Sequence, residues 1–191
     1  MSEQQKKVII LTAPSGAGKT SITKFLLANH PQLAFSVSAT TRAPRGAEQD
    51  GIDYHFISPA AFEGHIEQNN FLEYEMVYEG LYYGTLKSEL DRIWAQGKTP
   101  VLDIDVKGAI AIQKQLGDQA LSIFILPPSI EVLKERLEKR NTESAEKMQM
   151  RLDKAEYEIS HCDQFNAVVK NDILETACKE TATLIQDFIS K

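Results

Sequence analysis

The chain has 191 residues, 42% hydrophobic and 25% charged, and its 21 basic and 27 acidic side chains give a formal net charge of −6. A chain of this length forms one domain, or one domain with insertions, and buries enough apolar surface to need no disulfide bonds. The acidic balance excludes a general nucleic-acid-binding protein, because phosphate neutralisation needs a basic surface. No apolar run approaches the roughly 18 residues that a membrane helix requires.

The two cysteines, Cys162 and Cys178, show neither a CxxC spacing nor paired histidines nearby. This excludes a zinc finger or a thiol redox motif and is typical of a reducing compartment. The apolar run at residues 8–11 is too short for a signal peptide. We therefore expect a cytoplasmic protein without a membrane or nucleic-acid partner, and the sequence leaves its oligomeric state open.

Apolar runs with strand character alternate along the chain with segments of helical periodicity. The expected strands cover residues 7–12, 34–38, 99–105, 121–126 and 167–169, with a hairpin from residues 71–78 and 81–83. The expected helices end at Asn29, cover residues 87–96, 107–115 and 174–189, or begin at Ser58, Ser129 and Thr142. This alternation predicts an α/β fold, with a parallel sheet covered by helices on both faces. The aromatic, acidic stretch from about residue 36 to residue 87 has the character of an insertion.

A glycine-rich loop separates the first expected strand from the first expected helix, and it reads Ala13-Pro14-Ser15-Gly16-Ala17-Gly18-Lys19-Thr20. Strand, loop and helix in this order predict a P-loop, in which backbone N–H groups and the helix N-terminus hold phosphate oxygens. Lys19 adds an ammonium near the β- and γ-phosphates, and Thr20 offers its hydroxyl to Mg²⁺. Ala13 stands where the strict pattern has glycine. Because positive φ is costly for alanine, we expect Ala13 to keep a negative φ and the phosphate cradle to begin at Ser15.

Four further motifs follow the loop in order. They are Ser36-Val-Ser-Ala-Thr-Thr-Arg-Ala-Pro-Arg45, Gly51-Ile-Asp-Tyr-His-Phe56, Tyr82-Tyr-Gly-Thr85 and Leu102-Asp-Ile-Asp105. With the loop, this series resembles the guanylate kinases, P-loop nucleoside monophosphate kinases, over residues 8–172. The resemblance implies a P-loop NTPase-type parallel sheet with an inserted mixed α/β GMP-binding subdomain and a helical lid. It also implies Mg²⁺-dependent transfer of the γ-phosphoryl group of ATP to GMP, and to dGMP, in purine nucleotide metabolism and GMP recycling.

The same resemblance implies the boundaries of the parts. The guanylate kinase-like domain would cover residues 6–188. Its core would comprise residues 6–35, 98–133 and 155–191, its GMP-binding subdomain residues 36–88, and its lid residues 134–154.

The resemblance assigns eight residues to the GMP site, namely Ser38, Arg42, Arg45, Tyr54, Glu73, Tyr83, Thr85 and Asp105. Arg42 and Arg45 lie three residues apart on a loop and suit bidentate binding of the GMP phosphate, with the two tyrosine hydroxyls as further donors. Glu73 matches the position that reads guanine, because the N1–H and 2-amino groups of guanine need an acceptor. The remaining three accompany Glu73 at the base. Such a site rejects an analogue without these donors by roughly 10⁴–10⁵.

Asp103 and Asp105 are two residues apart on an expected strand, so both carboxylates should project from one face at the carboxyl edge of the sheet. Asp103 resembles the acid that faces Mg²⁺. Residues 134–151 resemble the mobile lid, and Arg136, Arg140 and Arg151 match the arginines that close over the ATP phosphates and the transferring group.

Two positions near the ATP site need separate comment. Asn141 departs from the usual glycine of the lid, but asparagine tolerates left-handed backbone, so we expect the turn to survive. Asn171 resembles a family position near adenine and is assigned to the ATP site.

The charge is divided along the chain in a way that fits these assignments. Residues 1–45 carry six basic side chains against one acidic side chain, a balance of +5, and contain the loop and the arginine pair. Residues 46–105 carry three against twelve, a balance of −9, and contain Glu73, Asp103 and Asp105. Two alternatives stay open, a non-catalytic guanylate-kinase-like interaction module and a kinase for another small phosphate ester.

Overall fold

The computed structural model describes residues 6–139 and 145–191, and these fall into two compact units. Unit 1 contains Lys6 and residues 32–102, and unit 2 contains residues 7–31 and the described part of residues 103–191. In the part of the chain that the structure describes, no helix is both long and apolar enough to cross a membrane.

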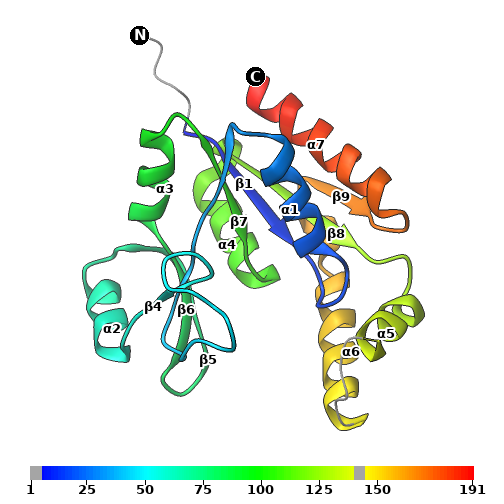
Figure 1. The fold of residues 1–191 in the computed structure, drawn as a ribbon, viewed down its shortest axis with the longest axis horizontal. Helices are drawn as coiled ribbons and strands as arrows, with labels where there is room; N and C mark the ends of the chain where they lie inside the picture. The colour runs from blue at the N-terminus through cyan, green and yellow to red at the C-terminus, as the bar shows by residue number, and fades with distance from the viewer. Residues whose placement is uncertain (1–5, 140–144) are drawn as a thin grey trace. The chain divides into compact units, whose positions relative to one another are not determined.

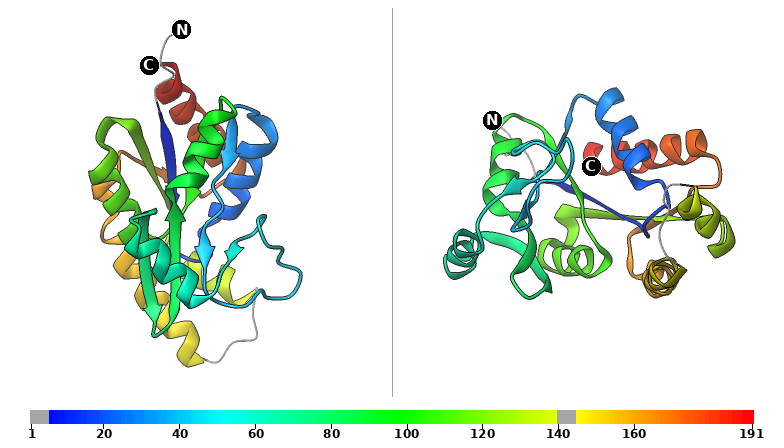
Figure 2. Two further views of the ribbon diagram at one scale, coloured as in Figure 1. Left: turned by 90° about the vertical axis from the view of Figure 1, so that its left-hand side faces the viewer. Right: turned by 60° about the horizontal axis from the view of Figure 1, so that its bottom comes forward.

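Unit 2 is built on a parallel arrangement of β1 (Val8–Thr12), β8 (Ala120–Leu126) and β9 (Ala167–Lys170), in which β8 pairs with both of the others. Its helices are α1 (Lys19–Asn29), α4 (Val106–Leu116), α5 (Ile130–Glu138), α6 (Ala145–Ile159) and α7 (Leu174–Ser190), with short 3₁₀ helices η1 (Gly117–Gln119) and η2 (Cys162–Gln164). Figures 1 and 2 show α1 and α7 side by side on one face of β1 and β8, with α4 on the opposite face. All five residues of β1 are buried, as expected for a strand covered on both faces.

Unit 1 contains a parallel pair, β2 (Leu33–Phe35) with β7 (Thr99–Asp103), and a four-stranded sheet in the order β4-β3-β6-β5. The latter strands are β3 (Ala39–Thr40), β4 (His55–Phe56), β5 (Phe71–Tyr78) and β6 (Leu81–Leu86), and the helices are α2 (Pro59–Glu67) and α3 (Lys87–Ala95). Phe62 of α2 stacks on Phe71 and Tyr82, with ring centroids 4.2 and 5.0 Å away. This aromatic stack fixes α2 on the antiparallel β5–β6 hairpin.

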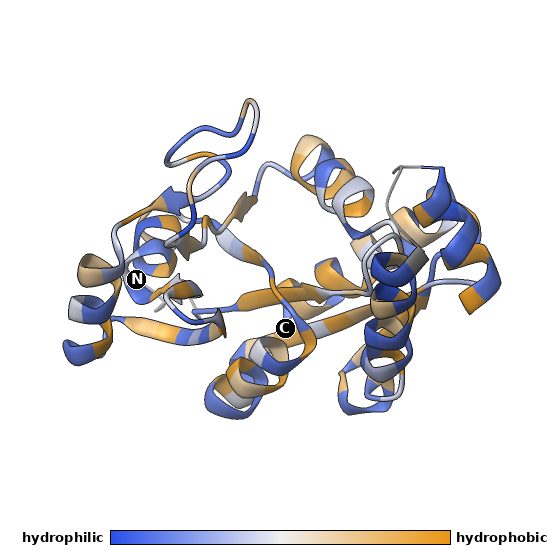
Figure 3. Ribbon diagram, turned by 90° about the horizontal axis from the view of Figure 1, so that it is seen from below, coloured by the Kyte–Doolittle hydropathy of each residue, from blue (hydrophilic) through white to orange (hydrophobic). Residues whose placement is uncertain are grey.

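The α/β fold with a parallel sheet is confirmed, and so are the local signals that predict its elements. The hydroxyls of Ser58 and Ser129 accept hydrogen bonds from the N–H groups of Ala61 (3.1 Å) and Val132 (3.3 Å), so each serine caps the helix that it was expected to begin. In Figure 3 the strands are mostly hydrophobic, whereas the helices carry both hydrophobic and polar residues. The expected helix start at Thr142 lies outside the described residues.

One expected strand is shorter than predicted. The pattern over residues 34–38 predicts a continuous strand, but β2 ends at Phe35 and β3 begins at Ala39. The N–H of Ser36 still donates to the carbonyl of Val101 (3.0 Å), whereas that of Val37 donates to the Glu89 carboxylate (3.1 Å). At Val37 a side-chain acceptor takes the place of a strand partner, and the strand does not continue to this residue.

Candidate nucleotide-binding sites

The loop between β1 and α1 has the backbone geometry of an anion-binding turn. Gly16 and Gly18 adopt φ values of +91° and +97°, and the N–H of Ala17 donates to the carbonyl of Pro14 (3.0 Å). Among the described residues other than glycine, Asn69 alone has a positive φ, so the prediction that Ala13 keeps a negative φ is confirmed. Gly18 is the N-cap of α1, so the N–H groups of the loop lie at the N-terminus of a helix, where anions bind.

Apolar contacts join this loop to α5 and α6, the helices that carry Arg136 and Arg151. Ala17 is fully buried in a cluster with Leu133 and Leu137 of α5 and Leu152 and Ala155 of α6. A Cβ added to Gly16 would lie 3.0 Å from a methyl carbon of Leu137. The positive φ favours glycine there, and any larger residue would in addition crowd Leu137 of α5.

Lys19 lies in the first turn of α1 and forms an ion pair with Asp103, the last residue of β7. Its ammonium also donates to the carbonyl of Ile104 at 3.4 Å. Thr20, the next residue, is exposed. A carboxylate and a hydroxyl are oxygen donors of the kind that Mg²⁺ prefers, so the chemistry of Asp103 and Thr20 fits that ion.

Asp105 does not share a strand with Asp103, so the expectation of two carboxylates on one strand face is wrong. β7 ends at Asp103, and Asp105 is the N-cap of α4, where its carboxylate accepts a hydrogen bond from the N–H of Gly108 (2.8 Å). Aspartate is among the residues preferred at this position, because its carboxylate satisfies an otherwise unpaired helix N–H. The helix signal that follows Asp105 was the feature that could have revealed this.

Two of the three predicted lid arginines lie in the described part of unit 2. Arg136 of α5 donates from Nη2 to the carbonyl of Asn171 (3.2 Å), and Arg151 of α6 donates from Nη1 to the hydroxyl of Ser15 (3.5 Å). Arg151 thereby reaches the exposed part of the phosphate loop. Arg140 and Asn141 lie outside the described residues.

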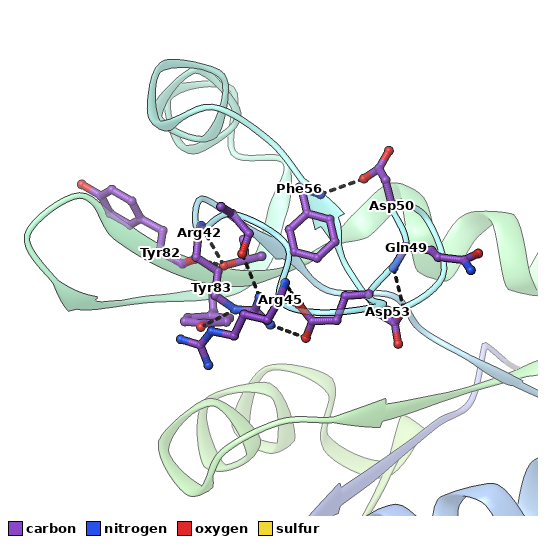
Figure 4. Close-up of polar contacts among 11 residues, drawn as sticks. Arg42, Arg45, Gln49, Asp50, Asp53, Phe56, Tyr82 and Tyr83 are labelled. Atoms are coloured by element: carbon purple, nitrogen blue, oxygen red, sulfur yellow. Dashed lines mark hydrogen bonds and ion pairs between the residues drawn. The ribbon is translucent and has the colours of Figure 1, made fainter.

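In unit 1, Arg42 is the centre of a group that we call the Arg42 cluster, which consists of Arg42, Arg45, Glu48, Tyr54 and Tyr83. Figure 4 shows Arg42, Arg45 and Tyr83 of this cluster. Arg42 donates to both carboxylate oxygens of Glu48 (2.6 and 2.7 Å), to the hydroxyl of Tyr83 (3.1 Å) and to the carbonyl of Ala43 (3.0 Å). Its guanidinium lies over the ring of Tyr54, 4.8 Å from the centroid. The backbone N–H of Arg45 also donates to Glu48 (2.8 Å).

These bonds limit the N–H groups that Arg42 has available for a phosphate. Four of the five N–H groups of its guanidinium are engaged, so a bidentate grip on a phosphate requires that Arg42 release part of Glu48. The Arg42 hydrogen bonds, with that of the Arg45 N–H, lower the pKa of Glu48 to about 2, so the carboxylate is charged at neutral pH. Sequence reasoning missed Glu48. The signal available was a carboxylate three residues after Arg45 in a turn-rich segment.

The predicted guanine-reading residues lie on the β5–β6 hairpin and beside it. Glu73 of β5 is paired with Thr85 of β6, and the Thr85 hydroxyl donates to Glu73 Oε1 at 2.8 Å. Ser38 immediately precedes β3, and its carbonyl accepts a hydrogen bond from the N–H of His55 (2.9 Å). Strand pairing thus fixes the carboxylate of Glu73 next to a second polar group.

A buried carboxylate that sequence reasoning also missed supports the segment before Ser38. Glu89 of α3 is 5% exposed and accepts hydrogen bonds from Val37 and from Arg92 (3.0 Å). Burial opposes its ionisation, but the hydrogen bonds from Arg92 and Val37 outweigh that effect and hold the pKa of Glu89 below its usual value. The spacing of Glu89 and Arg92, three apart on a helix, was the available signal.

Comparison with known proteins gives the family. The profile of the family described as guanylate kinase matches residues 5–188. The chain belongs to the guanylate kinase family. It is 50% identical over 186 residues to a guanylate kinase of Porphyromonas gingivalis, with 97% of this chain and 99% of that protein covered. A guanylate kinase of Salinibacter ruber is 49% identical, with 97% and 98% covered.

Solved structures agree with this family. The crystal structure of a guanylate kinase from Anaplasma phagocytophilum superposes with a TM-score of 0.77 at 28% identity, covering 97% of this chain and 87% of that one. A shikimate kinase from Bacteroides thetaiotaomicron has a TM-score of 0.51 at 13% identity, covering 97% and 99%, which shows a shared fold alone. The family predicted from the motifs is therefore confirmed.

Proposed function

We propose that this chain phosphorylates GMP, and also dGMP, at the expense of ATP, giving ADP and GDP or dGDP. Membership of the guanylate kinase family supports the reaction. The observation in the structure that carries the choice of acceptor is the hydrogen-bonded pair of Glu73 and Thr85. A carboxylate held by strand pairing is an acceptor for the N1–H and 2-amino groups of guanine, which adenine does not offer in that arrangement.

Unit 2 would bind ATP. The N–H groups from Ser15 to Thr20 would hold phosphate oxygens, and Lys19 would exchange its ion pair with Asp103 for the β- and γ-phosphates. Thr20 and Asp103 would hold Mg²⁺, which supplies charge neutralisation at the phosphates when bound. Arg136, Arg140 and Arg151 would neutralise the charge of the transferring group, which is where an arginine can be worth roughly 10³–10⁵ in rate.

Unit 1 would bind GMP. Arg45, whose guanidinium extends from an exposed loop residue, would meet the phosphate first, and Arg42 would contribute its remaining N–H and its charge. The hydroxyls of Tyr54 and Tyr83 would complete the phosphate contacts. A phosphate oxygen of GMP would then attack the γ-phosphorus in line with the bond to ADP, without a covalent enzyme intermediate.

Around the base, Glu73 would accept the N1–H and 2-amino groups. Ser38, Thr85 and Asp105 would accompany it. Because Asp105 also caps α4, its carboxylate has one oxygen committed to Gly108, and contact with guanine would use the other. The domain boundaries and the cytoplasmic location expected from the sequence stay predictions.

The decisive experiment is ADP formation with Mg·ATP and a panel of GMP, dGMP, AMP, CMP and UMP. We expect turnover of GMP and dGMP and at most traces with the others. Faster turnover of AMP than of GMP would refute the guanine assignment. Binding of ATP and GMP without any turnover would favour an interaction module. A Lys19→Met variant should lose nearly all activity, and full activity would refute the P-loop assignment.

A further inference from the structure

Asn171 immediately follows β9 and is anchored to the sheet of unit 2. Its backbone N–H donates to the carbonyl of Leu126 (2.8 Å), which extends the β8–β9 pairing by one residue. The residue is only 3% exposed. Strand pairing and burial therefore fix the position of the Asn171 side chain.

That side chain is directed at the phosphate loop. Asn171 Nδ2 donates to the carbonyl of Ala17 at 2.7 Å, a buried hydrogen bond between residues 154 positions apart. A Cβ added to Gly18 would lie 2.2 Å from the same Nδ2. Gly18 thus has two reasons to be glycine, its φ of +97° and the asparagine amide packed against it.

The hydrogen bond determines how the peptide between Ala17 and Gly18 is oriented. In a trans peptide the C=O and the N–H point in opposite directions, so holding the Ala17 carbonyl toward Asn171 turns the Gly18 N–H away from it. Free N–H groups at the start of a helix are the groups that bind phosphate oxygens. We propose that Asn171 is a positioning residue that orients the Ala17–Gly18 peptide of the phosphate loop for phosphate binding.

Two further observations support this role. Asn171 Oδ1 is buried and has no hydrogen-bond partner within the described residues, a cost that a residue selected only for stability would avoid. The backbone carbonyl of Asn171 accepts the hydrogen bond from Arg136. One residue tied to β8 thus fixes the loop through its side chain and the arginine of α5 through its main chain.

The inference rests on the proposed function for the identity of its ligand, the phosphates of ATP. The variants are Asn171→Ala, which removes the donor, and Asn171→Asp, which keeps the side-chain shape and presents an oxygen to the Ala17 carbonyl. The probes are Mg·ATP and inorganic tripolyphosphate, which has no base, with affinities measured by calorimetry. The control is Asn166→Ala at the other end of β9, whose side chain accepts two hydrogen bonds from Ser122 (2.9 Å each) but does not touch the loop.

We expect the affinities for ATP and for tripolyphosphate to fall by the same factor, about tenfold for Asn171→Ala and more for Asn171→Asp. Asn166→Ala should lower the melting temperature and leave both affinities within about twofold. The aspartate variant serves for the test if the alanine variant does not fold.

Three results would overturn the proposal. The first is a loss of ATP affinity with unchanged tripolyphosphate affinity, which would place the action of Asn171 at the adenosine part. The second is no change with either probe. The third is an equal loss in Asn166→Ala. A wild-type chain that binds tripolyphosphate but does not phosphorylate GMP would instead contradict the proposed function and leave the role of Asn171 standing.

Discussion

The substitution Glu73→Gln tests how the acceptor base is chosen, because it removes a charge while it keeps the shape of the side chain. Glu73 Oε1 accepts the Thr85 hydroxyl at 2.8 Å, and the cross-strand pairing of the two residues holds that geometry. If the glutamine oxygen keeps the Thr85 hydroxyl, its NH₂ group faces the two N–H donors of guanine. Donor would then meet donor where the wild-type chain has a carboxylate oxygen.

The size of the expected effect follows from the hydrogen bonds to guanine that the variant loses. The variant loses at least one hydrogen bond to a charged group, which is worth about 2–3 kcal/mol. Converted to a rate ratio, this predicts a fall in kcat/KM for GMP of roughly 30- to 150-fold. The KM for ATP should change little, because the loop and Lys19 belong to unit 2.

The assay is steady-state ADP formation at saturating Mg·ATP with varied GMP, and its matched control is Glu79→Gln. Glu79 lies at the exposed tip of the same hairpin, so its replacement should leave kcat/KM within about twofold. A fall of less than threefold in Glu73→Gln would refute the base-reading role. An equal fall in both variants would show a general effect on the hairpin.

Three further substitutions separate the roles of other carboxylates. Glu48→Gln should raise the KM for GMP with little change in the KM for ATP, because Arg42 loses the partner that orients it, and a lowered KM for GMP would show instead that Glu48 competes with the phosphate. Asp105→Ala, measured without nucleotide, should cost about 1 kcal/mol of unfolding free energy through the lost α4 cap, a fall of about 2–4 °C in Tm, and an unchanged Tm would contradict the capping role. Glu158 is a buried residue of α6, and burial raises its pKa despite Lys154 of the same helix and Lys19 nearby. The stability that the wild-type chain has at acid pH is therefore lost as pH rises through that pKa. Glu158→Gln should therefore raise the Tm at pH 7, with a gain that shrinks toward pH 4, and a gain that grows on acidification would contradict this.

Local signals predicted most of the fold because each depends on neighbouring residues alone. The caps at Ser58 and Ser129, the turn at the phosphate loop and the hairpin are settled within a few residues of chain, and the structure confirms them. The two errors had the same origin. At Val37 and at Asp105 a side-chain hydrogen bond ended a strand that the hydrophobic pattern would have continued.

The candidate sites divide in a similar way. Lys19 and Arg42 were predicted from motifs, because their chemistry is carried by residue type and spacing, and Glu73 was predicted from the resemblance to the guanylate kinases. Glu48 and Glu89 were missed, since a carboxylate in a loop and one on a helix look like ordinary solvated charges until their partners are known.

The sequence by itself determined the family, the phosphate loop and the pairing of a basic first segment with an acidic second one. Only the tertiary structure decided which partners these groups have. Lys19 is paired with Asp103, Arg42 with Glu48, and the carbonyl of Ala17 with the side chain of Asn171. The reason is physical, because a buried or charged polar group must find a partner, and the folded chain supplies that partner from a residue that can lie more than a hundred positions away.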